Sequence, residues 1–234
     1  MVIIEVLILA TSDVHSPENL QLFLESLNQV NVNPHVVIFA GDMVKRNNVV
    51  ALRPVINAVK QKFPGTRIVS VFGNEEFLGY EELYMSVYRE ITWLNDSYLR
   101  DTFGGEEVCI IGTRGALDKL TTWQQRKMPL LEKRYKELPG KIEEIARQLR
   151  ALKCNKIILV SHYGVTYKNL VGEDPQTHPY LACSRLEQVL EKGLVDIVIH
   201  GHAHMGALEV IEVHGVTVYN VSLPARRKLV LIST

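Results

Sequence analysis

The sequence has little cysteine and no cysteine pair with a recognisable spacing. Its three cysteines, Cys109, Cys154 and Cys183, are odd in number and widely separated, and no Cys-x-x-Cys motif occurs. We therefore expect neither a disulfide framework nor a zinc site built from thiolates. Cysteine usage of this kind fits a reducing compartment best, so we expect a cytoplasmic protein.

An excess of charge and long apolar segments are also missing. Lysine and arginine number 26, as do aspartate and glutamate, which argues against broad electrostatic attraction to nucleic acid or to an anionic membrane. No run reaches the roughly 18 apolar residues that a membrane helix needs. The apolar stretch 2–10 has no basic flank and is interrupted by Glu5, so it predicts a first strand rather than a signal peptide.

The sequence does contain enough apolar residues, 47% of 234, for one full hydrophobic core. We expect a single α/β domain over residues 1–234, in which short β-branched runs alternate with amphipathic segments. The predicted strands are 2–10, 36–40, 67–72, 108–111, 156–160, 195–199, 208–213, 216–221 and 229–232. The predicted helices are one capped by Ser16 with Pro17 in its first turn, one over 48–62 that begins again at Pro54, and two more over 81–90 and 184–192.

The segment from about 117 to 152 differs from the rest because it is long, charged and largely helical. We expect a break at Pro139-Gly140, since proline and glycine interrupt helices. Charge runs are usually exposed, which favours a solvated helical hairpin. The alternative is a helical insertion that covers an active site.

Oxygen or imidazole side chains follow five of the predicted strands. In open α/β sheets, ligands bind beyond the carboxyl ends of the strands, so we expect these side chains to meet. His202 and His204 can lie on one side of an extended segment and serve two neighbouring ions. Such donors suit Mn, Fe, Zn or Co. The candidate metal ligands are Asp13, His15, Asp42, Asn74, His162, His202 and His204.

The ordered set of motifs resembles the calcineurin-like metallophosphoesterase family. The family pattern D-x-H, G-D, G-N-H, H and G-H-x-H appears as Asp13-Val14-His15, Gly41-Asp42, Gly73-Asn74-Glu75, His162 and Gly201-His202-Ala203-His204. The resemblance covers residues ~8–205 and implies a four-layer αββα fold, a mixed β-sandwich flanked by helices. It also implies a first metal held by Asp13, His15, Asp42 and His204, with Asp42 bridging to a second metal completed by Asn74, His162 and His202.

By this resemblance the protein hydrolyses a phosphate mono- or diester through a hydroxide that bridges two divalent metal ions, with manganese as the first choice. Two such ions carry more positive charge than the two aspartates remove, so the site attracts a phosphate ester. They also lower the pKa of bound water, and neutral Asn74 preserves the positive surplus. We expect a small phosphate ester as the substrate, whereas a membrane is not expected and nucleic acid is not favoured.

One position departs from the family pattern, because Glu75 stands where the family has a histidine that contacts the phosphate. Glu75 can have a raised pKa and act as the general acid. It can instead turn outward while another residue, for which His178 is a candidate, takes the role. A third interpretation is a substrate whose leaving group needs little protonation.

Two further residues are candidates for substrate binding. Arg114 follows its strand directly and can either hold a phosphate oxygen or form a salt bridge to a nearby carboxylate. Tyr163 adjoins a predicted ligand and is expected to line the pocket. His35 and His200 are expected to be structural hydrogen-bonding groups.

Two other function classes are compatible with these residues. The retromer scaffold subunit shares the family fold without hydrolysis, so a non-catalytic metal-binding scaffold is one alternative. The complete ligand set favours an enzyme, whereas Glu75 favours the scaffold. A small nuclease is the other alternative, and its basic groove would have to come from the segment 126–136.

Overall fold

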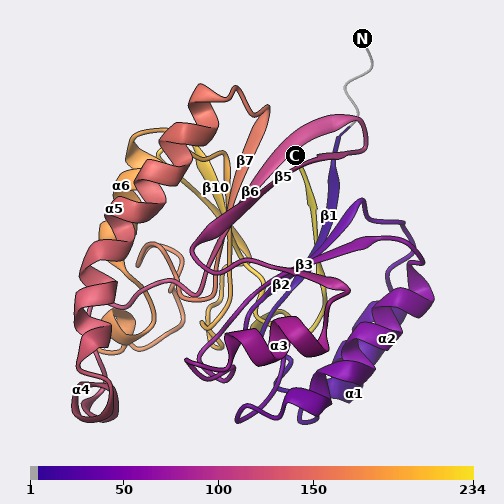
Figure 1. The fold of residues 1–234 in the computed structure, drawn as a ribbon, viewed down its shortest axis with the longest axis horizontal. Helices are drawn as coiled ribbons and strands as arrows, with labels where there is room; N and C mark the ends of the chain where they lie inside the picture. Colours follow the sequence, from indigo (N-terminus) through magenta and orange to yellow (C-terminus); the bar gives the residue numbers. More distant parts are fainter. Residues whose placement is uncertain (1–4) are drawn as a thin grey trace.

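Two β-sheets pack against each other between two groups of helices in the computed structural model, which describes residues 5–234 (Figure 1). Three hydrophobic clusters fill the spaces between the four layers. The predicted four-layer αββα fold is therefore confirmed. Residues 2–4 of the predicted first strand lie outside the described residues.

The first sheet has the strand order β11-β1-β2-β3-β4. Strands β1 to β4 are parallel, and β11 pairs antiparallel with β1 at one edge. Their bounds are Leu7–Thr11 for β1, Val36–Ala40 for β2, Arg67–Val71 for β3, Ile91–Trp93 for β4 and Val230–Ser233 for β11.

The second sheet has the order β5-β6-β7-β8-β10-β9. Its four central strands are parallel, and the edge strands β5 and β9 are antiparallel to their neighbours. The bounds are Ser97–Phe103 for β5, Glu106–Thr113 for β6, Lys156–Ser161 for β7, Ile197–His200 for β8, Val210–Val213 for β9 and Val216–Asn220 for β10.

The strands are apolar on both faces because each face is covered. In β2, Val37 packs toward the helices and Ile38 toward the other sheet. In β7, Ile157 packs toward the helices and Ile158 into the same central cluster as Ile38. Successive side chains of a strand point to opposite faces, so these continuous apolar runs are what two buried faces require.

Helices on the two outer faces complete the sandwich (Figure 1). On the first sheet lie α1, Leu20–Asn28, α2, Arg53–Lys62, and α3, Glu81–Val87. On the second sheet lie α5, Leu130–Ala151, and α6, Glu187–Glu191, with α4, Thr122–Lys127, preceding α5. Short helical turns occupy Val49–Leu52, His178–Tyr180 and Ser184–Leu186, and α7 spans Leu223–Arg226.

The predicted N-cap at Ser16 is wrong, because α1 begins at Leu20. The backbone of Ser16 is used elsewhere: its N–H donates to Met43 O at 3.0 Å, and its carbonyl accepts from Lys45 N at 3.1 Å. The chain after β1 therefore runs along the loop after β2 before it can turn into a helix.

The predicted helix break at Pro139-Gly140 is also wrong, since α5 continues through both residues. Leu138, Pro139 and Ile142 are buried on the face of α5 that contacts the second sheet. This packing holds the helix through the position where Pro139 cannot donate a hydrogen bond. The chain breaks earlier, at Met128-Pro129, between α4 and α5.

Cys109 and Cys154 form a disulfide, contrary to the expectation from their spacing. Cys109 lies on β6 opposite Ile157 of β7, and this register brings the Cα atoms of Cys109 and Cys154 to 6.1 Å. Cys183 is free and buried. The cysteine argument for a cytoplasmic location therefore fails, and the location stays a prediction. None of the helices in the described part of the chain is both long and apolar enough to span a membrane.

Candidate metal centre

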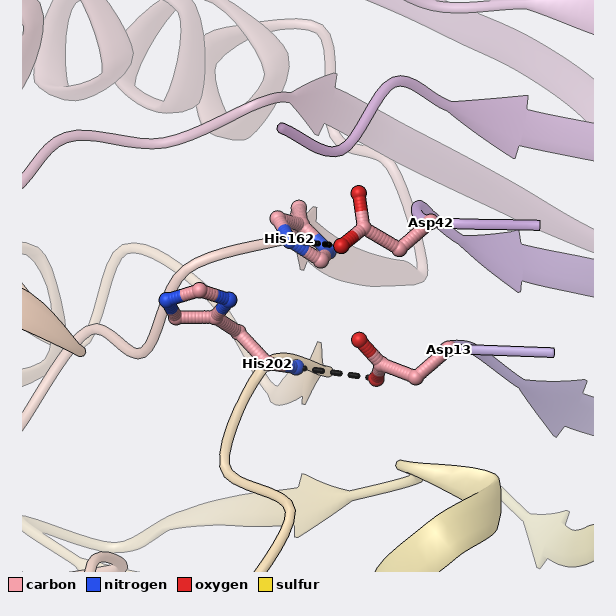
Figure 2. A group of neighbouring side chains, drawn as sticks. All are labelled: Asp13, Asp42, His162 and His202. Carbon is pink, nitrogen blue, oxygen red and sulfur yellow. Dashed lines mark hydrogen bonds and ion pairs between the residues drawn. The ribbon is translucent and has the colours of Figure 1, made fainter. Parts of the chain in front are cut away.

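Parallel strands of both sheets end at a common edge, and polar side chains from four of them meet there. Asp13 follows β1, Asp42 follows β2, His162 follows β7 and His202 follows β8. Each offers one ligand atom, and these four atoms lie within 4.8 Å of one another. Figure 2 shows the two carboxylates pointing from the first sheet toward the segments that carry the histidines of the second sheet.

Direct contacts join the two sheets at this point. His162 Nε2 lies 3.5 Å from Asp42 Oδ2, and the backbone N–H of His202 donates to Asp13 Oδ2 at 2.9 Å (Figure 2). Asn74 Oδ1 lies 3.1 Å from His162 Nε2. The loops after β1, β2, β3, β7 and β8 therefore share one site.

A second group of possible ligands adjoins the first and consists of Asp13, His15 and His204. Asp13 Oδ1 lies 3.0 Å from His204 Nε2 and 3.8 Å from His15 Nε2. Asp13 thus belongs to both groups, whereas the family resemblance implies that Asp42 is the shared ligand. All seven predicted ligands lie in or next to these two groups.

The backbone at the site adopts conformations that side chains other than glycine rarely take. Asp13, His15, Asp42 and His202 have positive φ angles of 57°, 45°, 52° and 67°. Such residues cost of order 1–3 kcal/mol each and persist where the surroundings fix them. These tight turns aim the four side chains back across the strand ends.

His162 is oriented by the first sheet. Its Nδ1 contacts the carbonyl oxygen of Ala40 at 3.0 Å, so Nδ1–H donates and Nε2 carries the lone pair. Burial holds the pKa of His162 well below its usual value, so the ring stays neutral. Its Nε2 lone pair therefore faces two acceptor oxygens, from Asp42 and Asn74, and a cation between these atoms would relieve the repulsion.

The electrostatics of the two aspartates also fit a cation. Asp13 and Asp42 are fully buried. Burial, followed by the charges of Glu76 and Asp13, raises the pKa of Asp42. Burial also opposes ionisation of Asp13, but the hydrogen bond to His204 lowers its pKa overall.

Two ring nitrogens complete the fit to a divalent metal. His15 Nε2 and His202 Nδ1 are buried without a hydrogen-bond partner among residues 5–234. Burial lowers the pKa of His202 to about 4, so this ring is neutral, as a metal ligand must be. Neutral imidazoles with carboxylate and amide oxygens form a donor set suited to Mn, Fe, Zn or Co.

Glu75, which replaces the family histidine, lies beside the site. Its N–H donates to Asp42 Oδ1 at 2.7 Å, and its carboxylate accepts a hydrogen bond from the backbone N–H of Arg46. The side chain is thus directed to the loop after β2. Its role in catalysis stays a prediction.

Glu76 is a residue of the site that the sequence patterns do not identify. Its buried carboxylate accepts hydrogen bonds from the backbone N–H groups of Asp42, Met43, Val44 and Gly73, at 2.8, 2.8, 3.1 and 2.7 Å. It thereby ties the loop after β2 to the loop after β3. The signal available in the sequence was the second of two adjacent glutamates after Gly73-Asn74.

Arg114 is buried and forms a salt bridge to Glu81 at 2.8 Å, which is one of its two predicted roles. It also donates to the carbonyl oxygens of Gly73 and Glu76, at 2.6 Å for Glu76. These contacts fix the backbone of the loop after β3 against the buried side chain of Arg114. The other predicted role, contact with a phosphate, stays a prediction.

Tyr163 and His178 differ in how close they lie to the site. The Tyr163 ring contacts that of His202 with a centroid distance of 4.8 Å and that of His162 at 5.1 Å. His178 packs against Tyr167 at 5.6 Å and lies outside both ligand groups. The structural histidines behave as expected: His35 accepts from Leu7 N at 2.9 Å, and His200 accepts from Asn169 at 3.0 Å.

A cavity of about 640 Å³ opens beside the ligands. Asn74 and His202 line it together with residues of the helical segment, including Trp123 of α4 and Tyr135 of α5. This segment therefore forms a wall of the cavity next to the site. The segment is therefore solvated on its outer face only, and its role as a cover over an active site stays a prediction.

Several solved structures have a similar fold at low sequence identity. The calcineurin-like phosphoesterase YfkN from Bacillus subtilis aligns over 99% of this chain and 90% of its own, with a TM-score of 0.59 and 13% identity. The 5'-nucleotidase precursor from Thermus thermophilus aligns over 98% of this chain and 54% of its own (TM-score 0.54, 14% identity). The NAD nucleotidase of Haemophilus influenzae aligns over 98% and 49% (TM-score 0.56, 15% identity). The chain thus spans about half the length of these nucleotidases.

No curated protein matches the sequence in a direct comparison. The model of the family described as calcineurin-like phosphoesterase, however, matches residues 6–206. That range contains both ligand groups and every strand that carries them. The chain belongs to the calcineurin-like phosphoesterase family.

Proposed function

We propose that this protein is a metal-dependent hydrolase of small phosphate esters. The observation that supports this most directly is the pair of adjacent ligand groups sharing Asp13, which could hold two divalent cations side by side. Such a pair, when bound, supplies an activated water and positive charge for the phosphoryl oxygens. Asp13, His15 and His204 would hold one ion, and Asp42, Asn74, His162 and His202, with Asp13, the other.

The residues of the chain prepare the site for this chemistry in three ways. Ala40 fixes the His162 ring, so its Nε2 points at the cluster without further adjustment. Asn74 contributes an oxygen but no negative charge, which preserves the attraction for a phosphate anion. His15 and His204 remain partly exposed, so ions and substrate can reach this side of the site.

The position of Glu75 favours one of its three interpretations. Its carboxylate is engaged by the N–H of Arg46, which suits a residue that organises the loop rather than one that protonates a leaving group. A substrate with a good leaving group would then need no acid from this position. His178 packs on Tyr167, and a role for it would require another conformation of its loop.

The fold relatives support a small substrate. Two of them are named as nucleotidases, and a nucleotide is a small molecule. This chain spans about half of those proteins, so their specificity is a proposal here and the class of ester is left as mono- or diester.

A nuclease is less well supported by the structure. Three of the five basic residues in segment 126–136 are paired with carboxylates: Lys133 with Glu137 at 3.8 Å, Arg134 with Asp96 at 3.2 Å and Lys136 with Glu132 at 2.7 Å. Arg126 and Lys127 are left to attract a polyanion, which is a small basic surface for a nuclease. Paired charges offer little net attraction to a polyanion.

The proposal is tested by metal removal and reloading. The chain is treated with a chelator, reloaded with Mn, Fe, Zn or Co, and assayed on aryl phosphomonoesters, aryl diesters, cyclic nucleotides and single-stranded DNA. We expect about two equivalents of bound metal and hydrolysis of small esters that requires it. Full activity of the metal-free chain would contradict the proposal, and metal binding without hydrolysis of any compound would favour the scaffold.

A further inference from the structure

We propose that the cavity beside the candidate metal centre binds the leaving group of the substrate, and that this group carries an apolar aromatic ring. The inference rests on the proposed function, because it assigns the organic half of the ester that the metal site would cleave. His202 belongs both to a ligand group and to the cavity lining, and Asn74, whose Oδ1 lies 3.1 Å from His162 Nε2, also lines the cavity. A phosphate at the ligands would therefore place its substituent at the entrance of the cavity.

The walls of the cavity are mainly apolar and contain many aromatic side chains. Six of the fifteen lining residues are phenylalanine, tyrosine or tryptophan, and they come from the loop before α3, from α4 and α5, and from the loops after β7: Phe77, Tyr80, Trp123, Tyr135, Tyr163 and Tyr180. Rings of this kind pack against a planar apolar group in stacked or edge-to-face contacts, which are favourable beyond the burial of area alone. A glycerol group, which has no ring, would gain little from them.

The charges around the cavity bear on the charge of the leaving group. None of its described lining residues is acidic, and Arg114 is already paired with Glu81. Lys127 is the other lining residue with a charge. A cationic leaving group would find no carboxylate here and would be repelled by Lys127, so a ring without positive charge is favoured.

The size of the cavity is that of a small-molecule site. A volume of about 640 Å³ lies within the range of roughly 300–1,000 Å³ typical of ligand pockets. It exceeds what a phosphate alone would fill. There is room for a fused ring system.

Three aromatic residues of the cavity lining keep apolar surface exposed to solvent. Trp123 is 63% exposed, Tyr80 47% and Phe77 44%. Burial of such surface by an apolar ligand is favourable because it removes the surface from water. Trp123 lies on α4, a short helix whose start is fixed by reciprocal bonds between Thr121 and Gln124, so its ring is presented from a defined position.

The test compares esters that differ in ring size but little in leaving-group acidity. Phenyl and 2-naphthyl phosphate are assayed, together with their methyl diesters, on the reloaded chain. We expect kcat/KM to be about tenfold higher for the naphthyl member, the ratio given by roughly 1.4 kcal/mol of extra apolar contact. Equal kcat/KM values for the two rings would overturn the inference.

Variants test whether the preference for the naphthyl ester comes from the cavity. Trp123→Ala should reduce the naphthyl preference severalfold, and Trp123→Phe should retain most of it. Leu130→Ala is the matched control, because Leu130 is 81% exposed on the same helical segment and does not line this cavity. A preference unchanged in Trp123→Ala would overturn the role of this wall.

A binding measurement separates this inference from the proposed function. Titration of the metal-free chain with 2-naphthol should show saturable binding that Trp123→Ala weakens and Leu130→Ala does not. If no ester is hydrolysed but 2-naphthol binds in this way, the proposed function fails and the aromatic site stands. If esters are hydrolysed but 2-naphthol does not bind, the proposed function stands and the aromatic site is overturned.

Discussion

The carboxylate of Glu76 holds the backbone of Asp42. Its Oε2 accepts from Asp42 N–H at 2.8 Å and from Gly73 N–H at 2.7 Å, while Oε1 accepts from the next two residues after Asp42. Asp42 has a φ of 52°, a conformation that needs support from its surroundings. The side chain of a neighbouring loop thus supplies part of the support for a candidate metal ligand.

Replacing Glu76 by glutamine should destabilise the protein. The amide nitrogen cannot accept hydrogen bonds, so buried N–H groups would lose their partner, at about 1–3 kcal/mol for each unsatisfied donor. We expect the free energy of unfolding in urea, measured with chelator present, to fall by about 2–4 kcal/mol. Glu82→Gln on the exposed face of α3 is the control and should change it by less than about 0.5 kcal/mol. Equal effects of the two variants would show that the contacts of Glu76 carry no stability.

Substitution of Asp13 and of Asp42 by asparagine should affect metal binding differently. Because Asp13 belongs to both ligand groups, Asp13→Asn should lower the affinity for both ions, whereas Asp42→Asn should weaken only the group with His162 and His202. Metal content after dialysis, measured by mass spectrometry, should fall below about one equivalent for Asp13→Asn. Asp101→Asn is the control, since Asp101 pairs with Arg67 on the surface. Loss of both ions in Asp42→Asn alone would restore the bridging role implied by the family resemblance.

The disulfide makes a prediction about thiols. Under denaturing conditions the unreduced chain should show one reactive thiol, Cys183, and three after reduction. The native chain should show none, because burial, followed by the charge of Asp118, raises the pKa of Cys183 to about 11. Reduction should lower the free energy of unfolding by about 2–4 kcal/mol. Three thiols in the unreduced, denatured chain would contradict the disulfide.

The elements that could be predicted from the sequence are those whose pattern is local. Strand β2 matches its predicted range, 36–40, because an apolar run buried on both faces is bounded by polar residues. Strand β5 was missed, because its alternate residues are exposed at a sheet edge and it carries Arg100 and Asp101. The predicted N-cap at Ser16 is wrong because the backbone of Ser16 bonds to a loop more than 25 residues further along the chain. No local sequence pattern reveals such a contact.

The candidate site, too, has residues that local sequence patterns predict and contacts that they do not. Its candidate ligands could be found because each follows a strand, and parallel strands end at one edge. The clamp of Glu76 and the pairing of Cys109 with Cys154 depend on contacts between separate loops and strands, so residue types and spacing alone did not indicate them. The same is true of the cavity, whose walls come from segments joined only by the tertiary fold.

Substitution by alanine should change the free energy of unfolding in opposite directions at Gly73 and Gly140. A Cβ on Gly73 would meet the side-chain oxygen and backbone nitrogen of Asp42 closer than real atoms approach, and these are atoms of the candidate site. Gly140 lies on the exposed face of α5, and a Cβ there would meet nothing within 4 Å. Gly73→Ala should therefore shift Asp42 and lower the free energy of unfolding by at least about 2 kcal/mol.

Gly140→Ala should instead raise the free energy of unfolding by about 0.5–1 kcal/mol, because alanine loses less backbone freedom in a helix interior. Urea unfolding of both variants measures the two signs, and metal content after dialysis should fall only in Gly73→Ala. Retention of full metal binding by Gly73→Ala would mean that the loop after β3 can move away from Asp42 at little cost. The close approach of these two loops would then not be needed to position the carboxylate.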